Sequence, residues 1–364
     1  MFINIDTSGT LNGFSELISN ALEDGAKGIV VFSCDANDWT PQELDPILKN
    51  IEVPIFGGIF PQILYKNKKY EKGTAILCFS DEAPTLHTIK NISNNAENIT
   101  ACLEGVEEEF NTMFVFVDAF STSIEKLIEA LYFEFGLENN FIGGGAGSLS
   151  FVQKPVIITN EGVTQDSAVI ATINKSCGIG VKHGWKSVKG SFQITKADKN
   201  TIVELDYKPA FEVYKEVVED HSRKLFKDDN FFDIAKAYPF GISKIGSEKV
   251  VRDPIAMVEN SLVCVGNVVV GDYVDILNSS TKELVEAASV ALIKAQEEKS
   301  EAEITFFIDC ISRVLFMEDD FQLELDAVAK DLNNLIGAMT LGEIANTGKE
   351  YLEFYNKTAV IGVL

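Results

Sequence analysis

The sequence predicts an α/β protein of two domains, in which mixed β-sheets carry helices and are built from repeated strand-helix-strand-strand units. Apolar runs of strand length alternate along the chain with segments of helical spacing. The order of these segments recurs, with glycines inside the third segment of each unit. A chain of 364 residues with 46% hydrophobic residues is long enough to fill two cores.

The first unit begins with GIVVFSCD at 28–35, an unbroken apolar run typical of a buried strand. PQELDPILKNI at 41–51 has helical spacing with proline near its start. VPIFGGIF at 53–60 reads as a strand interrupted by glycines, and GTAILCFSD at 73–81 as the strand that closes the unit.

The same order returns twice. In the second unit MFVFVDAF is the strand, SIEKLIEALYFEFG the helix, FIGGGAGS the glycine-bearing strand and turn, and DSAVIATIN the closing strand. In the third, ITFFIDCIS, FQLELDAVAKDLNN, LIGAMTLGEI and YNKTAVIGVL take these places. PAFEVYKEVVE, YPFGISK and SLVCVGNVVVGDYVDIL suggest a partial fourth copy. We place the domain boundary at residue 195, which divides the chain into 1–195 and 196–364.

The net charge, the N-terminal residues and the cysteine spacing argue against several classes of protein. A net charge of −24 argues against binding to nucleic acid, because too few cations are present to replace counterions on phosphates. The N-terminus MFINIDTSGT has no basic and apolar leader, and no run of apolar residues is long enough for membrane insertion, so we expect a cytoplasmic protein. The six cysteines are scattered singly, which suggests neither disulfides nor a metal site.

Glycines and a thiol mark the candidate ligand site. Gly143, Gly144 and Gly145 could let backbone N–H groups approach an anion, or could form a tight turn. Cys310 and Arg313 follow the first strand of the third unit, where α/β folds commonly form a ligand crevice. Arg313 could bind a carboxylate or lower the pKa of the thiol. The alternative is a structural arginine paired with Glu324.

Glu343 follows Gly342 directly after the glycine-bearing strand of the third unit. It could face the same crevice and pair with Arg313 or a ligand, or it could be a lone surface carboxylate. A catalytic thiol needs a base, and no pattern ties any histidine to Cys310, so we predict that Cys310 is not a nucleophile. His183 lies beside Gly184 and Trp185, and the indole of Trp185 could cover a flat ligand or pack into the core.

Several stretches together resemble the FIST N and FIST C domains over nearly the whole chain. They are HGWKSVKGSFQITKADKNTIVELDYKPAFEVY, YPFGI, VVRDPIA, DCISR, GAMTLGEI and YNKT. The Cys-x-Gly-Arg motif of the family appears here as Cys310, Ile311, Ser312 and Arg313. Its His-Asn-x-Thr ending appears as Tyr355, Asn356, Lys357 and Thr358, which adds Asn356 to the candidate ligand-binding residues.

The resemblance implies a sensory input protein of bacterial signal transduction that binds a small ligand and is not an enzyme. Since the sequence contains no output domain, we expect signalling through a separate protein such as a histidine kinase, a diguanylate cyclase or a chemoreceptor. One alternative is a haem-binding sensor of a gas such as nitric oxide, with haem b and His183 as axial ligand. A second is a thiol-dependent enzyme, which would need a base beside Cys310.

Overall fold

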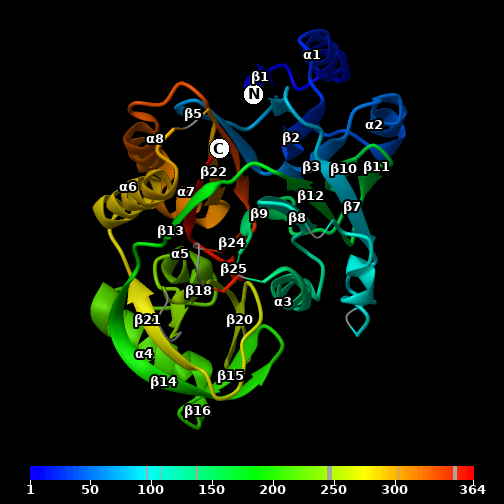
Figure 1. Ribbon diagram of the computed structural model, residues 1–364. Coiled ribbons are helices and arrows are strands. Elements are labelled where there is room, and N and C mark those ends of the chain that lie inside the picture. The colour runs from blue at the N-terminus through cyan, green and yellow to red at the C-terminus, as the bar shows by residue number, and fades with distance from the viewer. Residues whose placement is uncertain (96, 108, 137, 244–247, 302, 347–350) are drawn as a thin grey trace.

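Four β-sheets, three mixed and one antiparallel, form the framework of the protein (Figure 1). The computed structural model describes residues 1–364 except 96, 108, 137, 244–247, 302 and 347–350. The sheets carry helices, which confirms the predicted class of mixed sheets in an α/β protein. Of the helices that the structure describes, none combines the length and apolar character needed to span a bilayer.

The first mixed sheet is built mostly from the first predicted unit. Its strands, in spatial order, are β1 (Phe2–Asp6), β6 (Thr74–Phe79), β2 (Gly28–Cys34), β3 (Ile55–Phe60), β10 (Ile157–Thr159) and β11 (Gly162–Thr164). Only β2 and β3 run parallel. Helices α1 (Leu11–Glu23) and α2 (Pro41–Leu48) belong to the same part of the chain. Proline opens α2 where its missing N–H costs nothing.

The second and third mixed sheets have corresponding orders. The second contains β7 (Thr85–Lys90), β12 (Ser167–Ile173), β8 (Thr112–Asp118), β9 (Asn140–Ala146), β24 (Glu343–Ala345) and β25 (Glu353–Tyr355), with α3 (Ile124–Phe135) between β8 and β9. The third contains β13 (Gly178–Lys182), β26 (Ala359–Val363), β22 (Thr305–Cys310), β23 (Leu335–Thr340), β4 (Gln62–Tyr65) and β5 (Lys68–Tyr70). Its helices are α6 (Thr281–Glu298), α7 (Ile311–Met317) and α8 (Phe321–Ala329).

Each mixed sheet ends in a hairpin that comes from another part of the chain. The hairpin β10–β11 belongs to the second unit in sequence but joins the first sheet. In the same way, β24–β25 of the third unit joins the second sheet, and β4–β5 of the first unit joins the third sheet. In every case the hairpin pairs with the glycine-bearing strand, β3, β9 or β23. The three sheets therefore interlock in a closed cycle.

Glycines bring the parallel strands of each mixed sheet close together. A Cβ atom at Gly57 would lie 2.0 Å from the carbonyl oxygen of Val31. At Gly143 and Gly337 it would lie 1.8 Å from the corresponding oxygens of β8 and β22. Only glycine fits these three places without moving the neighbouring strand.

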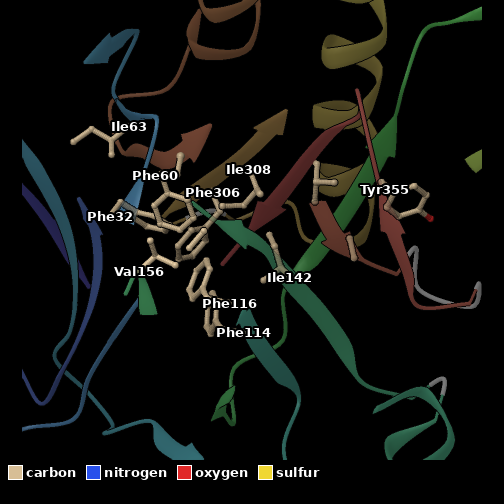
Figure 2. Close-up of a cluster of buried hydrophobic side chains, with 14 of the residues drawn as sticks. Phe32, Phe60, Ile63, Phe114, Phe116, Ile142, Val156, Phe306, Ile308 and Tyr355 are labelled. Atoms are coloured by element: carbon tan, nitrogen blue, oxygen red, sulfur yellow. The ribbon is translucent and has the colours of Figure 1, made fainter. Parts of the chain in front are cut away.

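Phenylalanine rings from β2, β8 and β22, the first strands of the three predicted units, meet in one core (Figure 2). The ring of Phe306 in β22 lies 5.2 Å from Phe114 in β8 and 6.4 Å from Phe32 in β2, measured between centroids. Phe32 in turn lies 5.7 Å from Phe116. The beginning, middle and end of the chain thus share the same buried surface.

The fourth sheet is antiparallel and curves around α4 (Ala210–Ser222), below the mixed sheets in Figure 1. It contains β18 (Val250–Arg252), β17 (Phe240–Ile242), β21 (Tyr273–Asn278), β14 (Lys186–Asp198), β15 (Thr201–Leu205), β20 (Ser261–Cys264) and β19 (Pro254–Val258), with β16 (Lys208–Pro209) paired to β15. Helix α5 (Phe231–Ala235) lies in the same part of the chain. Residue 195 falls inside β14, and the division into domains at that residue stays a prediction.

Candidate functional site

The end of β22 lies inside the protein. Cys310 is the last residue of β22, and α7 begins at the next position, so Arg313 lies in the first turn of the helix. Cys310 is 2% exposed and Arg313 is fully buried. The structure therefore brings these two predicted site residues together, but beneath the surface.

Arg313 uses every N–H of its guanidinium within the protein. Nε and Nη2 both donate to the Glu324 carboxylate, the former at 3.1 Å. Nη1 donates to the carbonyl oxygens of His183 at 2.8 Å and Lys357 at 3.3 Å, and Nη2 donates to that of Leu284 at 3.1 Å. This geometry is that of a structural arginine paired with Glu324, and it leaves no N–H for the carboxylate of a ligand.

Glu343 is buried beside Cys310, so its interpretation as a lone surface carboxylate is wrong. Its carboxyl oxygens accept hydrogen bonds from Thr340 Oγ1 at 2.9 Å and from the Thr358 backbone N–H at 3.2 Å. Arg313 forms its ion pairs with Asp309 and Glu324 rather than with Glu343.

The Glu343 carboxyl and the Cys310 thiol both favour their neutral forms. Burial raises the pKa of Glu343 to about 8, although hydrogen bonds from Thr340, Cys310 and Thr358 oppose the shift. Burial, reinforced by Glu343, raises the pKa of the Cys310 thiol well above its ordinary value. A buried thiol that stays protonated is a poor nucleophile.

Gly143, Gly144 and Gly145 lie within strand β9, so the interpretation as a tight turn is wrong. Gly144 is paired with Glu343 of β24, and the Gly145 N–H donates to the carbonyl oxygen of Gly342 at 2.8 Å. The glycines allow β24 to approach β9, because a Cβ at Gly144 would lie 2.8 Å from that same oxygen. Their role in binding a ligand stays a prediction.

Gly342 and Asn356 hold the two ends of the β24–β25 hairpin. Gly342 has a φ of +100°, and the ring of Phe354 occupies the space where a Cβ would lie. Asn356 is 2% exposed, and its Nδ2 donates to the carbonyl oxygens of Val251 at 3.4 Å and Val265 at 3.3 Å. Asn356 thereby ties the hairpin to the fourth sheet.

Two buried residues of the same region were missed by the sequence reasoning. The Lys357 ammonium pairs with Asp253 at 3.2 Å, donates to the Lys236 carbonyl oxygen at 2.9 Å and lies over the Trp185 ring at 5.1 Å. Burial raises the pKa of Asp253. Both residues lie in quoted stretches, YNKT and VVRDPIA, but a lysine or aspartate flanking a motif normally reads as a surface residue.

We call the ionisable groups at this place the buried polar cluster. They are Asp253, Asp309, Arg313, Glu324, Glu343 and Lys357, all at most 1% exposed. Four carboxyl groups face two cations. Burial raises the pKa of Asp253, Asp309 and Glu343, so protons on some carboxyls relieve the imbalance of charge.

His183 packs against the cluster in an arrangement that does not fit a haem ligand. Its Nδ1 accepts the backbone N–H of Trp185 at 2.8 Å, which places the proton of the neutral ring on Nε2. Nε2 lies 3.5 Å from a carboxylate oxygen of Glu248, and the residue is 5% exposed. Burial lowers the pKa of His183 to about 4. Both ring nitrogens therefore face protein groups, whereas an axial ligand needs one open to iron.

An open groove lies between α3, the β24–β25 hairpin and the fourth sheet. It has a volume of about 700 Å³ and is lined by residues from Glu125 to Phe133 of α3, by 351–354, and by Ile242, Val250 and Arg252. At one end of the groove, the Glu125 carboxylate accepts hydrogen bonds from the backbone N–H of Asn267 at 2.6 Å and from its Nδ2 at 2.9 Å. These bonds join α3 to the loop that follows β20 of the fourth sheet.

No residue of this groove was predicted as a site residue. The available signal was VVRDPIA, where Arg252 interrupts an apolar strand just before Asp253 and Pro254. Neither spacing nor composition indicates that this arginine lies opposite α3, because the two segments are far apart in the chain.

Comparison with known proteins agrees with the resemblance seen in the sequence. The FIST N domain pattern matches residues 28–208, and the FIST C domain pattern matches residues 210–346. An uncharacterized protein from Methanocaldococcus jannaschii is 21% identical over an alignment that covers 93% of this chain and 74% of the relative.

Proposed function

Because this chain belongs to the FIST family of sensory domains in signal transduction, we propose that it is a sensory input protein that binds a small ligand. The bound ligand changes the conformation of the chain, and a separate partner reads the change. A histidine kinase, a diguanylate cyclase or a chemoreceptor is the kind of partner that fits this role. Binding rather than catalysis is proposed because Cys310 keeps its proton.

The observation that carries this proposal is the continuity between the open groove and the buried polar cluster. Glu353 and Phe354 line the groove, and the chain then enters the cluster at Lys357. Arg252 lies beside the groove and donates from Nη1 to the carbonyl oxygen of Phe354 at 3.1 Å. A ligand in the groove would therefore contact the hairpin whose far end is held by buried charges.

Such an arrangement supports a switch between two conformers. A ligand shifts an equilibrium only by binding one conformer more tightly than the other. Buried ionic groups have few alternative arrangements that satisfy them, so a displacement of the hairpin would move the cluster between discrete states.

Ligand binding is tested with a metabolite library in a thermal-shift assay, followed by calorimetry on each compound that raises Tm. Hydrogen exchange with and without the ligand should then show slower exchange in β24, β25 and 356–358. A library without any stabilising compound would contradict ligand binding, and unchanged exchange in the hairpin would contradict the proposed route.

The signalling step is tested by mixing the chain with a kinase or cyclase from the same genome. The ligand should change the activity of the partner only when this chain is present. An equal effect without the chain would assign the response to the partner.

We also propose that the three mixed sheets are copies of one strand-helix-strand-strand unit. Two observations support this: their strand orders correspond, and Gly57, Gly143 and Gly337 occupy matching positions opposite β2, β8 and β22.

A further inference from the structure

Arg252 lines the groove, and one edge of its guanidinium is unused. Its Nε donates to the Asn267 carbonyl oxygen at 2.9 Å, and its Nη1 donates to the carbonyl oxygens of Val251 and Phe354, each at 3.1 Å. Within the part of the chain that the structure describes, Nη2 has no partner, and the guanidinium has no ion pair. The residue is only 5% exposed and lines the groove. A guanidinium so deeply placed gains from an acceptor at its free edge.

The charges around Arg252 favour a ligand with one negative charge. Burial lowers the pKa of Arg252, while Glu125, Glu353 and Asp272 oppose that shift and favour the charged guanidinium. They would repel a phosphate or a polyanion, because the described residues that line the groove include four carboxylates, Glu125, Glu129, Asp272 and Glu353, against two cations, Lys126 and Arg252. A single carboxylate can place its oxygen on Nη2 with the least repulsion.

The wall of the groove formed by α3 and the segment just before β25 offers aromatic surface. The Tyr132 and Tyr351 rings lie 5.0 Å apart, measured between centroids. Phe133 is 81% exposed and Tyr351 is 61% exposed, and both line the groove. Exposed aromatic rings beside a recessed charge suit a ligand with an apolar body and a polar end.

We propose that the groove binds an amphipathic organic monoanion. Its carboxylate accepts hydrogen bonds from Nη2 of Arg252, and its aryl or alkyl body packs on Tyr132, Phe133 and Tyr351. The proposal rests on the proposed sensory function and specifies the place and the chemical class of the ligand.

Calorimetry with 3-phenylpropionate and octanoate tests the assignment, with 3-phenylpropanamide and 3-phenylpropylamine as neutral and cationic analogues. We expect both carboxylates to bind, and the amide and the amine to bind at least tenfold more weakly. Equal affinity for 3-phenylpropionate and its amide would overturn the role of Arg252. Absence of binding by both carboxylates would overturn the proposed ligand class.

Phe133→Ala tests the location, because this exposed side chain can be removed without opening the core. It should weaken 3-phenylpropionate at least tenfold, whereas Leu225→Ala, at a 66% exposed residue outside the groove, should bind like the wild type. Arg252→Lys should weaken the carboxylates more than the amide, provided that its circular dichroism spectrum and Tm remain those of a folded protein.

Equal affinity of the wild type and Phe133→Ala would overturn the groove as the site. The proposed sensory function fails separately: a library metabolite that binds both proteins equally would leave that function in place and overturn only this inference.

Discussion

Arg313 holds four segments together through one side chain. Its partners lie in α8, in α6, after β13 and before β26. The sequence placed Arg313 at the end of a buried strand and offered Glu324 as its partner. The pairing with Glu324 is observed, but the strand ends at Cys310 and Arg313 lies in the first turn of α7. Its three carbonyl acceptors could not be predicted, because backbone groups carry no residue identity and these come from distant parts of the chain.

Arg313→Lys should destabilise the protein by about 3 kcal/mol. The lysine ammonium keeps the charge, but it cannot reach all the acceptors that the planar, forked guanidinium of Arg313 binds. Arg223→Lys is the matched control, since Arg223 pairs with Asp220 on the surface and is 80% exposed in its side chain. The control should change the free energy of unfolding by less than about 0.5 kcal/mol. Urea denaturation measures both, and equal losses would contradict a structural role for the buried fork.

Glu343→Gln should change how stability depends on pH. In the folded protein the pKa of Glu343 is raised from 4.5 to about 8, so the folded state holds a proton that the unfolded chain releases. This favours folding below about pH 4.5, and the advantage is lost as pH rises toward 8. The variant lacks this titration, so its stability relative to the wild type should increase from pH 5 to pH 8. Parallel urea midpoints over that range would refute the shifted pKa.

At the scale of elements, the sequence predicted the central strands of the mixed sheets well. GIVVFSCD, MFVFVDAF and ITFFIDCIS correspond to β2, β8 and β22, because fully buried strands form long apolar runs. The hairpins β4–β5, β10–β11 and β24–β25 were not predicted as exchanged elements. They are short, and their partners are set by tertiary packing that local spacing does not encode.

Gly337→Ala should destabilise the protein by about 3 kcal/mol or more, because the new Cβ would lie 1.8 Å from the Phe307 carbonyl oxygen and force the parallel strands apart. Gly57→Ala and Gly143→Ala should have similar effects if the three units are equivalent. Gly136→Ala is the control: its Cβ meets nothing within 4 Å, so only the backbone strain of its φ of +67° and ψ of −158° opposes alanine, at about 2 kcal/mol. Thermal unfolding measures all four, and a loss at Gly337 no larger than at Gly136 would count against close strand approach.

At the scale of the whole molecule, strands from both ends of the chain share sheets. The hairpin β4–β5 pairs with β23, and β24 pairs with β9. The phenylalanine core joins β2, β8 and β22 in the same way. Short-range patterns in the sequence identified the units but could not show which sheet each hairpin would join. The interlocking of the three sheets could therefore not be predicted from the sequence.

Residues 1–195 expressed alone should therefore fail to fold cooperatively. That fragment lacks β22, β23 and β26, so β4–β5 and β13 have no sheet to join, and Phe114 loses the ring of Phe306. The exposed strand edges and aromatic surface should make it aggregate or bind a hydrophobic dye. Co-expression with 196–364 should restore a complex with the circular dichroism and the single unfolding transition of the intact chain, because the missing strands are supplied from the second fragment.

The intact chain, nicked by a protease within 226–230, is the control, since the cut peptide bond lies outside the helices and strands and leaves every sheet complete. A monomeric 1–195 fragment with a sharp unfolding transition of its own would show that the first half does not need strands from the second.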